Sequence, residues 1–196
     1  MSAMNVSASQ KQLGQLLDFL QLLRKWNRVY NLTSIDNPSD MVSLHLLDSL
    51  SILPYLKGIH VLDVGTGAGL PGLPLAMLAT DKEFTLLDSN SKKIRFVRQA
   101  AIELGLSNVK VEHIRIERFE PGFGFDSILV RAFASLNDVV SETMRLLNPG
   151  GVILAQKGKL PQNEIIELDN QLIQVIPLKI PGIGVERHLV SIGIES

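Results

Sequence analysis

Three glycines spaced two residues apart, directly after an apolar β-type segment, constrain this chain more than any other feature. The β-type segment is IHVLDV at residues 59–64, and the stretch that follows it is Gly65-Thr-Gly67-Ala-Gly69-Leu-Pro71-Gly72. Glycines let the backbone turn sharply and let a ligand approach without meeting a Cβ atom. Pro71 suits the first position of a helix, where the missing N–H leaves no hydrogen bond unmade. This order predicts an α/β fold with a ligand-binding loop, and a tight structural connection is the alternative.

After this loop the chain alternates between short β-rich runs and helical segments. Strands are predicted at 59–64, 83–88, 108–114, 125–130 and 151–157, with helices at 71–79, 91–104 and 137–147 between them. Such alternation builds right-handed crossovers and a parallel sheet with helices on both faces. Two further β-rich runs, 171–180 and 185–194, have a Pro-Gly turn and no helix between them, which indicates an antiparallel hairpin at the sheet edge. The pattern therefore predicts a Rossmann-like, mostly parallel seven-stranded sheet.

The residues before the first strand have a helical period. Leucines at the i, i+3, i+4 and i+7 spacing predict a helix from Leu13 to Tyr30, and a second helix is expected from about Asp40 to Leu53. Neither helix can bury its apolar stripe alone. We therefore expect residues 1–57 to form a small helical extension packed on a domain formed by residues 58–196.

The loop and its acidic neighbours indicate the class of cofactor. A dinucleotide loop would have its third glycine at residue 70, where this chain has Leu70, and no GKS or GKT phosphate-binding motif is present. Asp88 ends the next strand, where a carboxylate can accept hydrogen bonds from ribose hydroxyls. Asp63 heads the loop, which suits a cationic amino group rather than a phosphate. S-adenosylmethionine fits these features, with Asp63, Gly67 and Asp88 as candidate contacts, and a nicotinamide oxidoreductase is a distant alternative.

Composition excludes several classes of protein. The absence of cysteine rules out disulfides, thiolate ligands and thiolate nucleophiles, and the four histidines lack metal-ligand spacing, so no metal is predicted. A net charge of −1 argues against electrostatic binding of nucleic acid by the domain as a whole. No apolar stretch reaches the roughly 18 residues of a membrane span, and the first residues lack a secretion signal. We expect a soluble cytoplasmic protein without a membrane partner.

Several segments together resemble one known family over nearly the whole chain, from about Trp26 onward. The segments are KWNRVYNLTS (25–34), DVGTGAGLPG (63–72), FTLLDS (84–89), LVRAFASL (129–136) and GIGVERHL (182–189). They resemble the bacterial 16S rRNA guanine-N7 methyltransferases, the RsmG or glucose-inhibited division protein B family. The resemblance implies a class I S-adenosylmethionine-dependent methyltransferase fold. It also implies S-adenosylmethionine as methyl donor, a guanine N7 in the decoding-region (530) loop as acceptor, and 16S rRNA or the small ribosomal subunit as partner.

The same resemblance assigns cofactor contacts to particular residues. They are Gly65, Leu70, Ile116, Glu117 and Arg131. We expect Arg131, after the fourth strand, to act also in catalysis by orienting the donor or the guanine through its planar fork. The alternative is a structural ion pair between Arg131 and a carboxylate such as Glu117 or Asp63.

The residue inventory is compatible with an N7 acceptor. Methylation at carbon five of a pyrimidine needs a cysteine nucleophile, which this chain lacks. Exocyclic amines are typically methylated beside an Asn/Asp-Pro-Pro-aromatic motif, but the chain has Val-Arg-Ala-Phe at 130–133. Guanine N7 has a free lone pair and no proton to lose, so alignment of the two reactants can suffice. A methyltransferase for a small molecule or protein, and a non-catalytic ribosome-binding protein, remain the alternatives.

Basic and aromatic side chains supply the remaining candidates. The RNA-binding candidates are Lys92, Lys93, Lys157, Arg187 and His188, although ordinary solvated charge is the alternative for each. Phe133 either stacks on a base or packs in the core. Trp26 and Tyr30 are interpreted as an aromatic pair that docks the first helix, with Asn31 as its C-cap. The alternative places Asn31 and Thr33 at the pocket mouth, and His45 is interpreted as a hydrogen-bonded structural histidine near Asp48.

Overall fold

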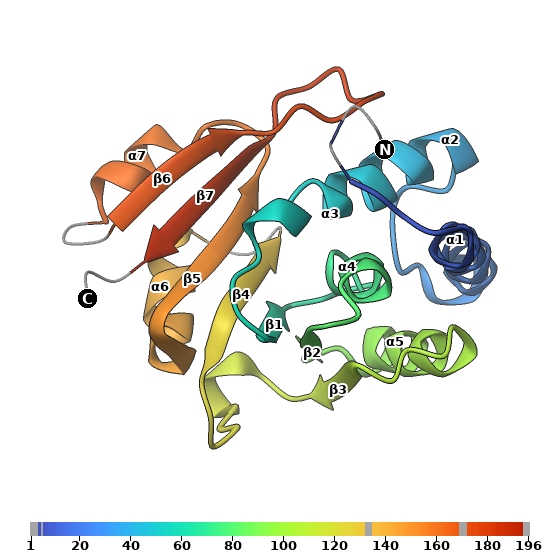
Figure 1. The fold of residues 1–196 in the computed structure, drawn as a ribbon, viewed down its shortest axis with the longest axis horizontal. Coiled ribbons are helices and arrows are strands. Elements are labelled where there is room, and N and C mark those ends of the chain that lie inside the picture. Colours follow the sequence, from blue (N-terminus) through green and yellow to red (C-terminus); the bar gives the residue numbers. More distant parts are fainter. Residues whose placement is uncertain (1–3, 5, 132–134, 169–171, 194–196) are drawn as a thin grey trace.

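The fold is a seven-stranded, mostly parallel sheet covered by helices on both faces (Figure 1). The computed structural model describes residues 4, 6–131, 135–168 and 172–193. The strands are β1 (His60–Val64), β2 (Glu83–Asp88), β3 (Val109–His113), β4 (Phe125–Arg131), β5 (Leu147–Lys157), β6 (Leu172–Pro177) and β7 (His188–Gly193). Their order across the sheet is β3-β2-β1-β4-β5-β7-β6. The first five strands are parallel, and β7 pairs antiparallel with both β5 and β6, which confirms the predicted hairpin.

The helices largely follow the sequence pattern. They are α1 (Gln10–Tyr30), α2 (Pro38–Met41), α3 (Asp48–Leu50), α4 (Gly72–Leu78), α5 (Ser91–Glu103), α6 (Leu136–Thr143) and α7 (Gln162–Ile166). The prediction that Pro71 opens a helix was wrong by one residue, because Pro71 is the N-cap and α4 begins at Gly72. The five-residue helix α7 was not predicted, since it is too short to show an apolar period.

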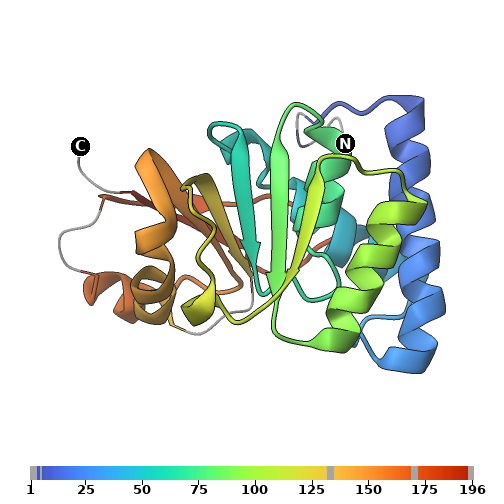
Figure 2. The same cartoon turned by 90° about the horizontal axis from the view of Figure 1, so that it is seen from below.

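The sheet separates two apolar clusters, and neighbouring residues of each buried strand face opposite ways. In β1, Val61 packs into the cluster that also holds residues of α1, α2, α4 and α5, whereas Leu62 packs into the cluster with α6. Figure 2 shows α1 and α5 together on one side of the sheet and α6 on the other. Strands buried on both faces explain the continuous apolar runs in the sequence. The division of the chain at residues 57 and 58 stays a prediction.

Aromatic side chains dock α1 on the sheet-covering helix α5. The Trp26 ring lies 5.3 Å from the Tyr30 ring and 5.7 Å from the Phe96 ring, measured between centroids. Asn31 ends α1 with a φ of 50° and donates its backbone N–H to the Asn27 carbonyl. The docking interpretation of the aromatic pair, with Asn31 as C-cap, is therefore confirmed.

The second predicted helix is interrupted. Asn37 caps its start at Pro38, and the backbone is wound as a π-helix over Val42–Leu47 before α3 ends at Leu50. A helical segment is therefore present where the sequence predicts one, but it ends at Leu50 rather than near Leu53, and its π segment was not predicted. Single π turns are rare and are found frequently at functional sites.

Candidate active site

The glycine loop between β1 and α4 has the backbone conformation that the sequence indicates. The φ angles of Gly65, Gly67 and Gly69 are 67°, 58° and 78°, in the region that favours glycine. A Cβ atom at Gly69 would lie 2.4 Å from the Leu73 side chain, whereas one at Gly67 would meet no atom nearer than 3.8 Å. The backbone at Gly67 is therefore open, and a ligand can approach it.

The Asp63 side chain holds the glycine loop in place through hydrogen bonds. Its carboxylate is buried, and Oδ2 accepts hydrogen bonds from the Thr66 hydroxyl at 2.6 Å and the Gly72 N–H at 2.9 Å. Burial raises the pKa of Asp63 to about 6, although these two hydrogen bonds and the charge of Arg131 lower it. Oδ1 is buried and has no hydrogen-bond partner among the described residues. Asp63 thus holds the loop with one oxygen, while the other is a buried acceptor without a donor in the described part of the chain.

A cavity of about 120 Å³ beside the loop brings together several of the predicted cofactor contacts. Its lining includes Gly65, Asp88, Ile116 and Glu117. Asp88 accepts a hydrogen bond from the Gly67 N–H at 2.9 Å and another from the Asn90 N–H at 2.8 Å, so it ties the end of β2 to the loop. Of the other predicted contacts, Gly67 lies on the loop itself, and the Leu70 side chain is buried in the core.

The loop, the cavity and Asp63 fit S-adenosylmethionine. The backbone at Gly67 leaves room for a ligand, and the unpartnered carboxylate oxygen of Asp63 behind the loop suits a cationic amino group better than a phosphate. Two larger hollows, of about 590 Å³ beside α1 and about 430 Å³ at the amino ends of the strands, contain none of the predicted cofactor residues. The candidate site is therefore identified by its backbone geometry and chemistry rather than by its size.

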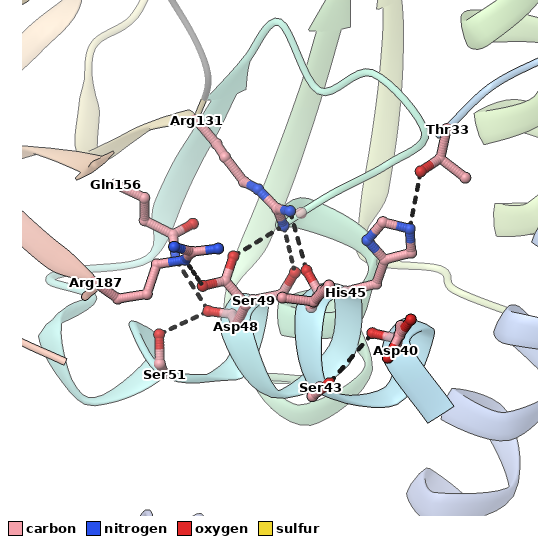
Figure 3. Close-up of polar contacts among 12 residues, drawn as sticks. Thr33, Asp40, Ser43, His45, Asp48, Ser49, Ser51, Arg131, Gln156 and Arg187 are labelled. Atoms are coloured by element: carbon pink, nitrogen blue, oxygen red, sulfur yellow. Dashed lines mark hydrogen bonds and ion pairs between the residues drawn. The ribbon is translucent and has the colours of Figure 1, made fainter. Parts of the chain in front are cut away.

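A second group of polar residues lies, like the glycine loop, at the carboxyl edge of the sheet, where Arg131 ends β4 (Figure 3). Arg131 forms an ion pair with Asp48 at 3.3 Å and donates a hydrogen bond to the Leu44 carbonyl at 3.1 Å. Arg187, just before β7, contacts the other oxygen of Asp48 at 3.3 Å. The alternative of an ion pair between Arg131 and a carboxylate is therefore confirmed, but the partners named for it, Glu117 or Asp63, were wrong, because the carboxylate that reaches Arg131 is Asp48 of α3. We call Asp48, Arg131 and Arg187 the ionic cluster.

Two neutral side chains border the ionic cluster. The Gln156 amide donates to the Asp48 carbonyl at 3.0 Å, and its own oxygen is buried without a partner. His45 Nε2 lies 3.0 Å from the Thr33 hydroxyl, which confirms the interpretation of His45 as a hydrogen-bonded structural histidine. Burial, with a smaller contribution from the charge of Arg131, lowers the pKa of His45 to about 4. His45 is therefore neutral at physiological pH.

The RNA-binding candidates have different surroundings. Lys157 forms an ion pair with Glu164 at 2.9 Å, Arg187 belongs to the ionic cluster, and His188 Nδ1 lies 3.1 Å from the Gly158 carbonyl. Lys92 is exposed on the first turn of α5. The Lys93 ammonium lies 3.9 Å from the position of a Cβ added to Gly67, so it borders the glycine loop. Phe133 lies outside the described residues.

Two further properties concern the described part of the chain as a whole. Within residues 4, 6–131, 135–168 and 172–193, no helix is long and apolar enough to cross a membrane. Over the same ranges, no group of three histidine, aspartate or glutamate side chains is placed to hold a metal ion.

The sheet order and the glycine loop after β1 define a class I S-adenosylmethionine-dependent methyltransferase. Solved structures share this fold. An S-adenosylmethionine-dependent methyltransferase from Aquifex aeolicus superposes with a TM-score of 0.61 at 20% identity, over 88% of this chain and 98% of that one. A precorrin-6y C5,15-methyltransferase from Geobacter metallireducens superposes with a TM-score of 0.56 at 15% identity, over 75% of this chain and 86% of that one. At these identities the likeness establishes the fold alone.

Sequence comparison then narrows the class to a family. The family model described as rRNA small subunit methyltransferase G matches residues 12–190, and the chain belongs to this family. The ribosomal RNA small subunit methyltransferase G of Methylococcus capsulatus is 51% identical, over 98% of this chain and 94% of that protein. The protein of the same name from Nitrosococcus oceani is 48% identical, over 96% of this chain and 89% of that protein.

Proposed function

We propose that this protein transfers a methyl group from S-adenosylmethionine to N7 of a guanine in the decoding-region (530) loop of 16S rRNA. Membership of the rRNA small subunit methyltransferase G family supports an S-adenosylmethionine-dependent rRNA methyltransferase. The observation that carries the proposal is that the open glycine loop and Arg131 lie at the same edge of the sheet, after the neighbouring strands β1 and β4. Ligands of open α/β sheets bind outside this edge.

The cofactor contacts follow from the surroundings of the loop. The backbone from Gly65 to Gly69 receives the ligand, with Asp88 at the ribose and Ile116 and Glu117 lining the cavity beside it. Asp63 contacts the amino group directly or through a water, which requires the loop to expose Oδ1, an atom that is buried and unpartnered among the described residues. When bound, S-adenosylmethionine would supply an activated methyl group on a sulfonium sulfur, with a neutral thioether as the leaving group.

The protein contributes alignment rather than proton transfer. Guanine N7 carries no proton, so the new N–C bond forms without a general base. His45 is neutral, buried and hydrogen-bonded to Thr33, which makes it an element of the structure and not a base in this reaction. Holding two reactants in line can supply roughly 7–11 kcal/mol of the barrier reduction. Arg131 orients the donor or the guanine with its planar guanidinium group.

The substrate is structured rRNA or an assembling small subunit in the cytoplasm. With a net charge of −1, the chain has only local basic groups for the phosphate backbone. Lys92 and Lys93 lie at the start of α5, and Lys93 borders the glycine loop. Lys157 ends β5, Arg187 directly precedes β7, and His188 begins β7. Several of these groups already have protein partners, so binding depends on the shape of the RNA as well as on charge.

A methyl-transfer assay tests the proposal. Small subunits that lack the modification are incubated with tritiated S-adenosylmethionine and the protein, and the labelled nucleosides are identified after digestion. The expected product is 7-methylguanosine in 16S rRNA, and subunits that already carry the methyl group serve as the unreactive control. Label on a ribosomal protein, on another nucleoside or on a small molecule contradicts the acceptor. No transfer, despite binding of the subunit, would favour a non-catalytic ribosome-binding protein.

A further inference from the structure

Asp48 is a buried carboxylate that the proposed chemistry does not use. It is 3% exposed and lies between two guanidinium groups, with Oδ2 facing Arg131 and Oδ1 facing Arg187 (Figure 3). Arg131 ends β4 and Arg187 directly precedes β7, so Asp48 joins segments that are more than fifty residues apart. Burying a carboxylate carries a desolvation cost, which two cations from distant segments offset here.

The charge balance of the ionic cluster is specific to this arrangement. Burial raises the pKa of Asp48, and the charges of Arg131 and Arg187 lower it. With Asp48 ionised, two arginines and one aspartate give a net charge of +1, and His45 beside them stays neutral because its pKa is about 4. The charge of Arg131 also partly offsets the rise that burial causes in the pKa of Asp63, behind the glycine loop. Without Asp48, two positive charges would act on the site.

A site with two uncompensated arginines is poorly suited to the reaction. The sulfonium of the methyl donor is a cation, and the purine becomes a cation when its N7 accepts the methyl group. Like charges repel strongly where water is partly excluded. The reaction therefore needs Arg131 for orientation, and it also needs an anion that limits the positive potential around it.

We propose that Asp48 is a positioning residue that holds Arg131 and Arg187 and offsets their charge, so that the site accepts a sulfonium cofactor. This inference rests on the proposed function. The Leu44 carbonyl and the Ser49 hydroxyl complete the positioning, since they accept hydrogen bonds from Arg131 at 3.1 and 3.5 Å. These contacts lie within and beside the π segment, which brings Leu44, Asp48 and Ser49 to one guanidinium group.

Two ligands that differ in the charge on sulfur test this role. S-adenosylmethionine has a cationic sulfonium, and S-adenosylhomocysteine has a neutral thioether but otherwise shares the adenosine and amino-acid groups. Asp48→Asn keeps the size of the side chain and removes its charge. By titration calorimetry we expect its affinity for S-adenosylmethionine to fall about tenfold, the order that one unit charge exerts in a partly buried site. The affinity for S-adenosylhomocysteine should change less than about twofold by the same reasoning.

Two further variants make the test decisive. Asp81→Asn removes the same charge from an exposed position at the opposite edge of the sheet and should leave the ratio of the two affinities unchanged. Arg187→Gln removes a positive charge from the ionic cluster, so this ratio should shift in favour of S-adenosylmethionine. Arg187→Gln also keeps the test open if Asp48→Asn fails to fold, which a thermal unfolding scan reveals.

Each outcome separates the inference from the proposed function. Equal loss of both ligands in Asp48→Asn, with no shift in Arg187→Gln, overturns the inference and leaves Asp48 as a purely structural ion-pair partner. Failure of the unaltered protein to bind either ligand overturns the proposed function instead. Selective loss of the sulfonium ligand in Asp48→Asn, with the opposite shift in Arg187→Gln, supports the role proposed for Asp48.

Discussion

The two halves of the carboxyl edge of the sheet are built by different means. On the β1 and β2 side, the site consists mainly of the backbone from Gly65 to Gly69, which the side chains of Asp63 and Asp88 hold in place. All of these residues belong to two adjacent strand–loop segments. On the β4 and β5 side, the site consists of side chains, and Asp48, Arg131 and Arg187 come from three distant parts of the chain. One half therefore depends on local conformation, and the other depends on the completed tertiary structure.

The largest expected effect tests the backbone half. Gly67→Ala should weaken the binding of S-adenosylmethionine about 100-fold, or ~2.7 kcal/mol, because its Cβ would occupy the open space over the loop. Because the backbone at position 67 is left-handed, the alanine should also lower the free energy of unfolding by about 1–2 kcal/mol. Calorimetry measures the binding, and chemical denaturation measures the stability.

Gly105→Ala is the matched control. Gly105 has a φ of 65° after α5 and no neighbour within 4 Å of an added Cβ, so it carries the same backbone strain without bordering the loop. It should lose similar stability and keep full affinity for the cofactor. If both variants bind the cofactor equally well, the ligand does not lie over Gly67.

The next largest expected effect is on the pH dependence of the free energy of unfolding, to which His45 and Asp63 contribute differently. The folded pKa of His45 is about 4, below its usual 6.5, so the unfolded chain binds more protons between these values and stability is lost as the pH falls. Asp63, with a pKa of about 6, acts in the opposite direction between pH 6 and its usual value of 3.8. His45 and Asp63 therefore contribute opposing pH dependences.

Comparison with His45→Gln isolates the histidine. Since Asp63 contributes to both proteins, its effect cancels in the difference between them. The stability of the unaltered protein relative to His45→Gln should fall by about 2 kcal/mol between pH 7 and pH 5, measured by urea unfolding at each pH. A difference that does not change with pH means that His45 is protonated to the same degree in the folded and unfolded chains.

The smallest effect concerns RNA binding beside the backbone half. Changing both Lys92 and Lys93 to Gln should weaken binding to small-subunit rRNA by only about three- to tenfold at moderate salt. The slope of log affinity against log salt should fall by about 1 to 2, because one to two phosphate contacts are lost. Changing the exposed Lys11 and Lys25 on α1 to Gln removes the same charge and should leave the slope unchanged if α5 faces the RNA.

The same contrast explains how much the sequence could predict. The strand β2 was predicted at its observed bounds, and the glycine loop was predicted as a sharp turn, because both depend on residues close together in the chain. The partner of Arg131 could not be predicted, since Asp48 lies 83 positions away and is brought near only by the tertiary fold. For the same reason Gln156 was not recognised as a neighbour of the ionic cluster.

The order of the last strands has a consequence for biosynthesis. β7 is made after β6 but lies between β6 and β5, and Arg187 precedes β7 directly. β1 to β5 and the glycine loop are all made before residue 187, whereas the ionic cluster needs Arg187 and the inner place beside β5 needs residues 188–193. The half of the site that surrounds Arg131 therefore cannot be complete until this late segment has been synthesised.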